Sequence, residues 1–182
     1  MLFNIVSPAR IMLPTLLLLL TGCRSPTGEV SREIADPVPS YSLFRKQVKL
    51  LHLDFFARHA LNSENATTGL SPESVLVRVY QLRDNKQFQK ATYRQLAEQG
   101  NQALQKDLLE SHSLIIRPGS AIALTAPLAA EARYIAVIAL FRQPNLDKND
   151  WRLLLARREL DADRARAIEL RDNYLRLKKN NN

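Results

Sequence analysis

Strict alternation of apolar and polar side chains is the feature that most restricts the fold of this chain. In the stretch KLLHLDFFARHA, the apolar residues Leu51, Leu53, Phe55 and Ala57 alternate with wetter positions, which predicts a strand with one buried face. The stretch ESVLVRVYQL is rich in β-branched and aromatic residues and predicts a second strand. A period of two does not fit a helix, so the core must be built from strands.

Later segments repeat this β character. SLIIRPGSAIALTAP predicts two strands around the turn dipeptide Pro118-Gly119. The run from Tyr134 to Phe141 is almost wholly apolar and predicts a central strand buried on both sides, and WRLLLARREL predicts a further strand headed by Trp151.

The C-terminal stretch AIELRDNYLRL predicts a hairpin. A turn at residues 172–173 pairs Ile168 with Leu177 and Leu170 with Leu175 on one face. A helix is the alternative, but its apolar stripe is poorer.

One segment, about 85–109, switches to a helical period. Asp84 or Asn85 is a candidate cap, and Gly100 is a natural stop. The first predicted helix carries Phe88, Ala91, Thr92 and Leu96 on one side, and a second from about Gln102 faces Leu104 and Leu108 inward. About eight strands with this short helical insertion predict a mainly β protein, a two-sheet antiparallel β-sandwich.

The N-terminus carries a secretion signal. Residues 1–22 have one basic residue, Arg10, followed by an apolar run that is too short to span a bilayer. The run ends in Leu20-Thr21-Gly22-Cys23, which resembles a bacterial lipobox, in which the cysteine is acylated and the chain is cut just before it. An ordinary signal peptide with a stray cysteine is the alternative. Cys23 is the only cysteine, so the chain has no internal disulfide.

The remaining 160 residues divide into a tether and one domain. Residues 23–46 contain three prolines, scattered charges and no apolar period, which predicts a flexible tether behind the lipidated Cys23. Residues 47–182 form the predicted sandwich domain, a size that buries about two thirds of its surface. The formal net charge of +8 loses only Arg10 on cleavage. An exported lipoprotein meets no nucleic acid, so the candidate partners for this positive charge are lipid head groups or an acidic protein. The alternative is a basic surface that has no function.

No catalytic or metal site is predicted, and no cofactor. The histidines, His52, His59 and His112, show neither HxH nor HxxxH spacing, and no GxSxG or phosphate-loop motif occurs. The carboxylates Asp161 and Asp163 lie in a charged loop and are predicted to be solvated. Among the aromatic residues, Phe56 and Tyr93 fall on the wetter faces and are candidate partner contacts, while the others fit a core.

Several motifs in order resemble one known family. After the lipobox and tether come LDFFARHALN, SPESVLVRVYQLRDNKQFQKATYRQL, DLLESHSLIIRPGSAIAL, YIAVIALFR and NDWRLLL. Together, over roughly residues 49–155, they resemble the TssJ family, the outer-membrane lipoproteins of bacterial type VI secretion systems.

The resemblance implies a transthyretin-like β-sandwich with a helical excursion and no enzymatic activity. It also implies attachment to the periplasmic face of the outer membrane through Cys23, where Arg24 stands in place of an inner-membrane retention signal. The implied partner is the periplasmic C-terminal region of a TssM-like inner-membrane protein, bound largely by the loop between the first two strands. In this sequence that loop consists of Leu61, Asn62, Ser63, Glu64, Asn65, Ala66, Thr67, Thr68, Gly69, Leu70 and Ser71.

Strand order supports this site independently. If consecutive strands run antiparallel, the loops at 62–71, 118–120 and 143–150 emerge at one end and together offer more surface than one loop alone. Two rival functions remain open: a lipoprotein that binds a small ligand or peptidoglycan in a cleft between its sheets, and an exported hydrolase, which lacks a nucleophile–base motif.

Overall fold

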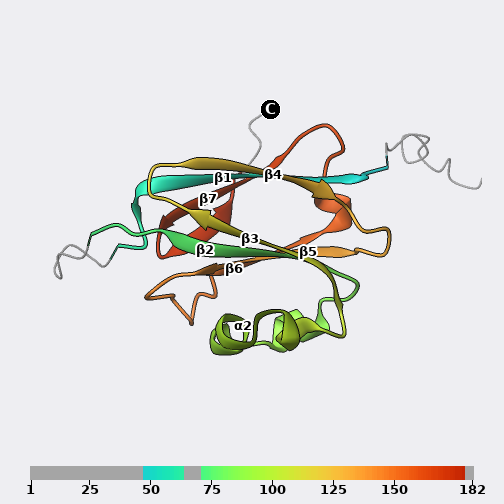
Figure 1. Cartoon of the computed structure of the whole chain (residues 1–182), viewed down its shortest axis with the longest axis horizontal. Coiled ribbons are helices and arrows are strands. Elements are labelled where there is room, and N and C mark those ends of the chain that lie inside the picture. The colour runs from blue at the N-terminus through green and yellow to red at the C-terminus, as the bar shows by residue number, and fades with distance from the viewer. Residues whose placement is uncertain (1–46, 64–70, 179–182) are drawn as a thin grey trace, which may run out of the picture. The chain divides into compact units, whose positions relative to one another are not determined.

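The computed structural model describes residues 47–63 and 71–178. Within these ranges, eight strands form two four-stranded sheets that stack face to face (Figure 1). The β1 sheet has the order β4 (Ala121–Pro127), β1 (Leu50–Leu61), β7 (Arg166–Asp172) and β8 (Tyr174–Leu177). The β2 sheet has the order β3 (Leu108–Ile116), β2 (Val75–Leu82), β5 (Tyr134–Leu140) and β6 (Arg152–Ala156). The predicted two-sheet β-sandwich is confirmed.

The alternation in β1 places the core as predicted. Leu51, Leu53 and Phe55 are fully buried between the sheets, whereas Phe56 and Arg58 lie on the opposite, outer face. Because the side-chain period of a strand is two, the apolar residues at the odd-numbered positions of β1 are buried together, whereas His59, toward the end of the strand, is exposed.

One pairing departs from the all-antiparallel prediction. β1 and β7 pair in parallel, with Phe55 opposite Ile168 and Leu61 opposite Asp172. Both strands run toward the same end of the sandwich, and the long chain between them makes the whole β2 sheet and β4 before it returns. Parallel neighbours require such a long crossover, which strand patterning alone does not reveal.

The Pro118-Gly119 turn joins the two sheets. β3 pairs with β2, and β4 pairs with β1, so the strands on either side of the turn belong to different sheets. The chain therefore passes from one layer of the sandwich to the other at this turn.

The central strand and the C-terminal hairpin are as predicted. β5 lies between β2 and β6, and its five middle residues are buried. β7 and β8 form a hairpin in which Ile168 pairs with Leu177 and Leu170 with Leu175, the predicted register.

The helical segment forms a third layer on the outer face of the β2 sheet (Figure 1). It consists of α1 (Lys86–Lys90), α2 (Tyr93–Gln99) and a 3₁₀ turn, η2 (Gly100–Leu104). The prediction of one helix across Ala91 and Thr92 is wrong, because Ala91 is extended (ψ 134°) and Thr92 is the N-cap of α2. Thr92 and Gln95 form a reciprocal capping box. The Thr-x-x-Gln spacing that indicates this helix start is present in the sequence.

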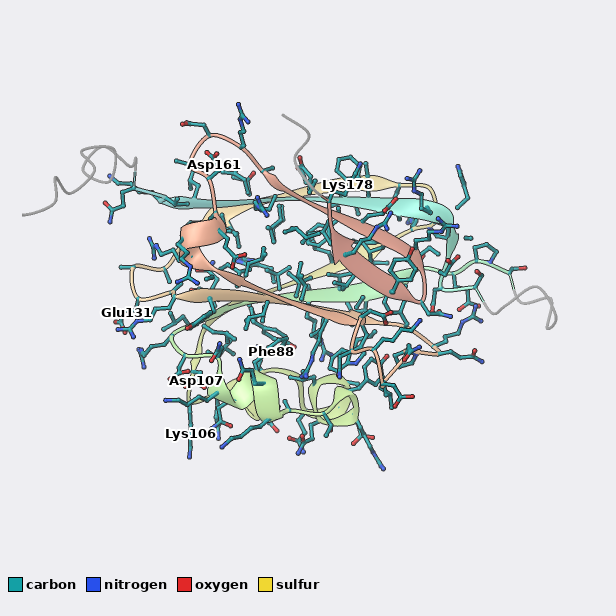
Figure 2. The ribbon with its side chains drawn as sticks, turned by 180° about the vertical axis from the view of Figure 1, so that it is seen from behind. Phe88, Lys106, Asp107, Glu131, Asp161 and Lys178 are labelled. Atoms are coloured by element: carbon teal, nitrogen blue, oxygen red, sulfur yellow. The ribbon has the colours of Figure 1, made fainter. Side chains whose placement is uncertain are left out.

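Two arginines of the β2 sheet attach this layer. The guanidinium of Arg152 donates to the carbonyl oxygens of Phe88 (3.2 Å) and Ala91 (3.1 Å), and that of Arg78 donates to the carbonyl of Leu96 (2.7 Å). These carbonyls lie at or near helix C-termini, where no intrahelical donor is available. Figure 2 shows Phe88 between the layer and the sheet. Another 3₁₀ turn, η3 (Arg157–Glu159), follows β6.

In the described part of the chain, no helix is both long enough and apolar enough to cross a membrane.

Candidate functional site

Four connections converge at one end of the sandwich, which we call the tip. The pairing of Val75 with Ile116 brings the start of β2 beside the end of β3, and the pairing of Leu76 with Leu140 brings it beside the end of β5. The tip therefore holds the connections 117–120 and 141–151 and the described ends of the β1–β2 connection, 62–63 and 71–74, which confirms the predicted clustering of three loops. The β7–β8 turn is a fourth member, because Leu61 pairs with Asp172.

Asn62 fixes the root of the β1–β2 connection. It is 3% exposed and has a left-handed backbone (φ 53°). Its backbone N–H donates to the carbonyl of Asp172 (2.5 Å), and its side-chain Oδ1 accepts from the backbone N–H of Arg142 (2.8 Å). Its Nδ2 donates to the carbonyl of Ser74 (3.4 Å). Through its backbone and its side chain together, Asn62 thus links three of the four tip connections.

Arg142 holds the same loop from the other side. Its guanidinium donates to the carbonyl oxygens of Asn62 (2.7 Å) and Ser71 (3.0 Å), and it forms an ion pair with Glu73 (3.3 Å). Both described ends of the predicted binding loop are therefore fixed to the β5–β6 connection. Residues 64–70 of that loop lie outside the described residues, and so does Cys23.

The fourth connection is joined to the others by Asn173. Its Nδ2 donates to the carbonyl of Ser63 (3.1 Å), and the backbone N–H of Leu175 donates to the carbonyl of Asp150 (2.8 Å). Sequence reasoning found this turn as a hairpin but missed its place at the tip, because that place depends on the parallel β1–β7 pairing.

Unusual backbone conformations gather at the tip. Among the described residues, the non-glycine positions with positive φ are Asn62, Asn149 (φ 52°) and Asp172 (φ 47°), and all three lie in tip connections. Asn and Asp tolerate this conformation better than other side chains, but it still carries a cost. Such positions persist where the surroundings impose them, and they concentrate at functional sites.

Gly119 belongs to the same region. Its φ is +72°, and a Cβ at this position would lie 2.6 Å from the ring of His59. Its backbone N–H donates to the carbonyl of Arg58 (3.3 Å). The glycine lets the β3–β4 turn approach β1 closely.

The surface of the tip combines charged groups with one exposed apolar side chain. The charged groups are mixed, with ion pairs Arg142–Glu73 and Arg171–Asp172 (3.3 Å each), and Leu146 is exposed in the β5–β6 connection. Hydrogen-bonded loops with one protruding apolar side chain suit protein recognition.

The three histidines lie apart from one another in the structure. His52 lies on the outer face of β1, with Nδ1 3.2 Å from Thr125 Oγ1, whereas His59 lies beside Gly119 and His112 lies on β3. Across residues 47–63 and 71–178, no group of three or more His, Cys, Asp or Glu side chains is placed to hold a metal.

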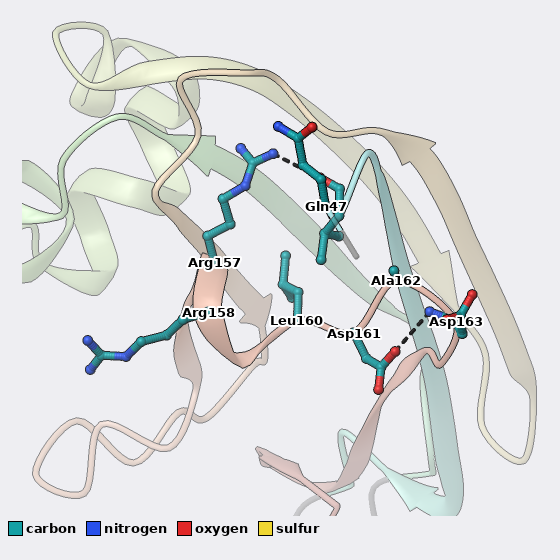
Figure 3. A pocket seen from close by; sticks show the side chains of 8 residues that line it. Gln47, Arg157, Arg158, Leu160, Asp161, Ala162 and Asp163 are labelled. Atoms are coloured by element: carbon teal, nitrogen blue, oxygen red, sulfur yellow. Dashed lines mark hydrogen bonds between the residues drawn. The ribbon is translucent and has the colours of Figure 1, made fainter. Parts of the chain in front are cut away.

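A surface hollow at the opposite end, the base, bears on the small-ligand alternative. It has a volume of about 590 Å³, and its lining includes Gln47, Arg157, Arg158 and Asp161 (Figure 3). The Arg157 guanidinium donates to the carbonyls of four residues, which are Val48, Ala129, Ala130 and Ala132. Arg157 therefore stabilises the fold. The hollow lies at the surface of the base.

The two aromatic candidates have different outcomes. The Tyr93 hydroxyl donates to the carbonyl of Phe141 (2.5 Å), and its ring packs edge-on against Trp151 at 5.0 Å between centroids. Burial raises the pKa of this phenol. Tyr93 is thus half-buried, with its hydroxyl and ring engaged within the domain, while Phe56 is 39% exposed.

The described residues thus define the class of β-sandwich proteins with a helical third layer and a hydrogen-bonded loop cluster at one end. Comparison with known proteins narrows the class. Residues 49–173 match the family model described as "Type VI secretion lipoprotein, VasD, EvfM, TssJ, VC_A0113". The chain belongs to this family.

Solved structures agree with this assignment. A chain of the structure described as "Type VI membrane complex" is 40% identical, with a TM-score of 0.68, covering 73% of this chain and 100% of that chain. A chain of the structure described as "T6SS protein TssM C-terminal domain (869-1107) from EAEC" is 38% identical, with a TM-score of 0.63, covering 72% and 99%. Serratia marcescens Lip, a membrane-bound component of the type VI secretion system, is 27% identical, with a TM-score of 0.61, covering 72% and 98%. Among curated protein sequences, none matches the chain.

Proposed function

We propose that this lipoprotein is anchored in the outer membrane through an acylated Cys23 and that its tip binds the periplasmic C-terminal region of a TssM-like inner-membrane protein. The protein would thereby link the two membranes in the core complex of a type VI secretion system, as a scaffold without catalysis. The observation that carries the proposal is the convergence of four hydrogen-bonded connections at one end of the sandwich.

The anchor is argued from the sequence. A mature lipoprotein cysteine carries three acyl chains, and each buried methylene contributes about 0.8 kcal/mol, so such an anchor holds stably where a single chain does not. The described sandwich begins at Gln47, near the base, where Leu50 pairs with Pro127. The residue that bears the anchor thus precedes the base end of the described domain, and the tip lies at the other end of that domain.

The partner is argued from the tip and from the comparisons. A standard protein–protein interface buries about 800 Å² per partner, more than one eleven-residue loop presents. Four connections held together by Asn62 and Arg142 offer a larger and preorganised surface, which lowers the entropic cost of binding. The 38% identical chain in a structure that carries the name of the TssM C-terminal domain supports this choice of partner.

Shortening the β1–β2 connection tests the partner. We expect that replacing residues 64–70 by two glycines leaves the melting temperature nearly unchanged, because the loop ends at Asn62 and Ser71 are retained. Binding to a periplasmic C-terminal fragment of TssM should be lost. A matched control shortens the base connection at 161–164, which should leave binding intact. Unaltered affinity of the tip variant would contradict the proposal.

Substitution at the lipobox tests the anchor. Cys23→Ser should release the exported protein from the membrane fraction, and Arg24→Asp should leave it acylated but move it toward the inner membrane in an enteric host. Membrane fractionation with acyl labelling measures both. Firm membrane attachment of the Cys23→Ser protein would reject the lipid anchor while leaving the partner proposal untouched.

A further inference from the structure

The two outer faces of the sandwich differ. The helical layer covers the outer face of the β2 sheet, whereas no described helix lies on the outer face of the β1 sheet (Figure 1). This second face, which we call the open face, is nearly flat along β4, where its residues are Ala121, Ala123 and Thr125. An uncovered sheet face is available to a partner or to a surface.

Apolar side chains protrude from the open face along β1. Leu50 is 45% exposed and Phe56 is 39% exposed, and the even spacing of the two residues puts both side chains on the outer side of the strand. Among the described residues, only two other large apolar side chains, Ile115 and Leu146, are exposed, and they lie on β3 and in the tip.

A buried carboxylate holds two arginines on this face. Glu169 is 2% exposed, its Oε1 accepts from Arg58 Nε (2.5 Å), and its Oε2 accepts from Arg176 Nε (2.8 Å) and Nη2 (2.6 Å). The two guanidiniums remain largely exposed and keep unused N–H donors. The cluster as a whole keeps one positive charge, and its donors are fixed in position.

Lysine adds to this charge. Lys178 Nζ lies 5.0 Å from the centre of the Phe56 ring, over the outer side of the β1 sheet (Figure 2). Asp54 is the other acidic residue of the face along β1, and Arg171 is neutralised by its neighbour Asp172. Exposed Lys49 precedes Leu50 at the base end of the same strand. The open face therefore combines protruding apolar and aromatic side chains with a small net positive charge, because Arg58, Arg176 and Lys178 outnumber Glu169 and Asp54 by one.

We propose that the open face docks on the anionic phospholipid surface of the membrane that holds the anchor. Arg58, Arg176 and Lys178 contact headgroup phosphates, and Phe56 and Leu50 enter the interfacial region. Arginine forks suit phosphate oxygens, and aromatic rings suit the level of the headgroups. The inference rests on the proposed lipid anchor, which brings the domain to the membrane.

The strength of this contact follows from the tether. A small net positive charge gives only weak binding to a membrane from solution, because each basic residue contributes modestly and salt screens the attraction. A domain attached to the membrane by the residues between Cys23 and Gln47 meets the surface at an effective concentration of about millimolar, so a weak contact is populated. The docked state leaves the tip connections at the end of the sandwich, where a protein partner can reach them.

Quenching by brominated lipids measures which face meets the bilayer. The lipidated full-length protein is reconstituted into phosphatidylcholine vesicles with or without phosphatidylglycerol, both containing brominated acyl chains. Phe56→Trp places a tryptophan on the open face, and the matched variant Ile115→Trp places one on β3, where the native side chain is 66% exposed. The buried Trp151 gives a constant background in both proteins.

We expect Phe56→Trp to be quenched about threefold more than Ile115→Trp in phosphatidylglycerol vesicles, with the difference falling at high salt. Adding Arg58→Gln, Glu169→Gln, Arg176→Gln and Lys178→Gln removes the charges without stranding a buried ion, and should abolish the difference. Circular dichroism checks that this variant folds.

Flotation of the same vesicles separates the two proposals. Protein that does not float with lipid would count against the anchor. Protein that floats but shows equal quenching at positions 56 and 115, or quenching independent of phosphatidylglycerol, would overturn the docking of the open face.

Discussion

The tip and the base of the sandwich are each held by an arginine that binds backbone carbonyls, yet the two ends differ. At the base, Arg157 donates to the carbonyls of four residues and ties the β4–β5 connection to the start of the domain. At the tip, Arg142 binds the two described ends of one long connection and an exposed Glu73. Arg157 stabilises the fold at the base, and Arg142 fixes the ends of a loop at the tip.

Backbone conformation shows the same difference. The positive-φ non-glycine positions of the described chain all lie at the tip. A region selected for stability alone would carry glycine at such positions or avoid them. The comparison indicates that the base contributes stability, whereas the tip keeps backbone conformations that carry a cost, as we expect of the proposed binding surface.

The largest expected effect on stability comes from the base. Arg157→Ala leaves four carbonyl acceptors without their donor, and we expect the free energy of unfolding to fall by about 3 kcal/mol. Affinity of the folded fraction for the TssM fragment should stay unchanged. Denaturant unfolding and a binding titration at low temperature measure the two quantities; a loss of affinity with little loss of stability would reverse the roles assigned to the two ends.

The second-largest loss of stability is expected at Asn62. Asn62→Ala removes a buried side chain with two hydrogen bonds and puts alanine at φ 53°, so we expect a loss of about 2 kcal/mol. Asn62→Gly relieves the backbone cost and should be less destabilising than alanine. Thermal unfolding of the pair measures the difference, and equal melting temperatures would show that the left-handed conformation carries no cost here.

Arg142→Ala should affect binding more than folding. The side chain is partly exposed, so we expect a loss of about 1 kcal/mol in stability and at least about a tenfold loss of affinity for the TssM fragment, because the loop ends are released. Arg142→Lys keeps the charge but not the forked donors and serves as the control. Full affinity in the alanine variant would break the link between Arg142 and the partner surface.

Acid titration probes a site between the two ends. Burial acts to raise the pKa of the Glu169 carboxyl, but the hydrogen bonds and charges of Arg176 and Arg58 outweigh it and leave that pKa below its ordinary value. The unfolded chain then binds the proton more readily, so the stabilisation is complete above about pH 4.3 and is lost as the pH falls through the folded pKa. Glu169→Gln should flatten this part of the stability curve. Identical pH dependence in both proteins would exclude Glu169 as its source.

The smallest effect is expected at Asn149, which has φ 52° in the β5–β6 connection. Asn149→Gly should change the free energy of unfolding by no more than about 0.5 kcal/mol, because asparagine already tolerates this conformation and glycine adds freedom to the unfolded chain. Denaturant midpoints measured side by side test this. A large loss would mean that the Asn149 side chain has a structural role of its own.

Features set by local patterning could be predicted from the sequence. The alternation in β1 gave its buried face, and the turn at residues 172–173 gave the β7–β8 register pair by pair. Both features depend on residues that are close together in the sequence. The three-loop cluster also followed, because strand direction alone fixes which loops share an end.

Features set by distant contacts could not. The parallel pairing of β1 with β7 joins residues more than a hundred positions apart, and the β7–β8 turn reaches the tip only through it. The roles of Arg142 and Arg157 likewise depend on carbonyls that the fold brings together, for which single-sequence patterns carry no signal. The break between α1 and α2 is different, since the Thr92–Gln95 capping box was legible in the sequence.

The most direct test of the account is amide hydrogen exchange of the protein alone and in the presence of the TssM periplasmic C-terminal fragment. We expect new protection at 62–63, 71–74, 117–120, 141–151 and 173, with the base connections at 128–133 and 157–165 unchanged. Protection centred on the base or on the helical layer, with the tip amides exchanging as in the free protein, would contradict the claim that the tip is the binding end.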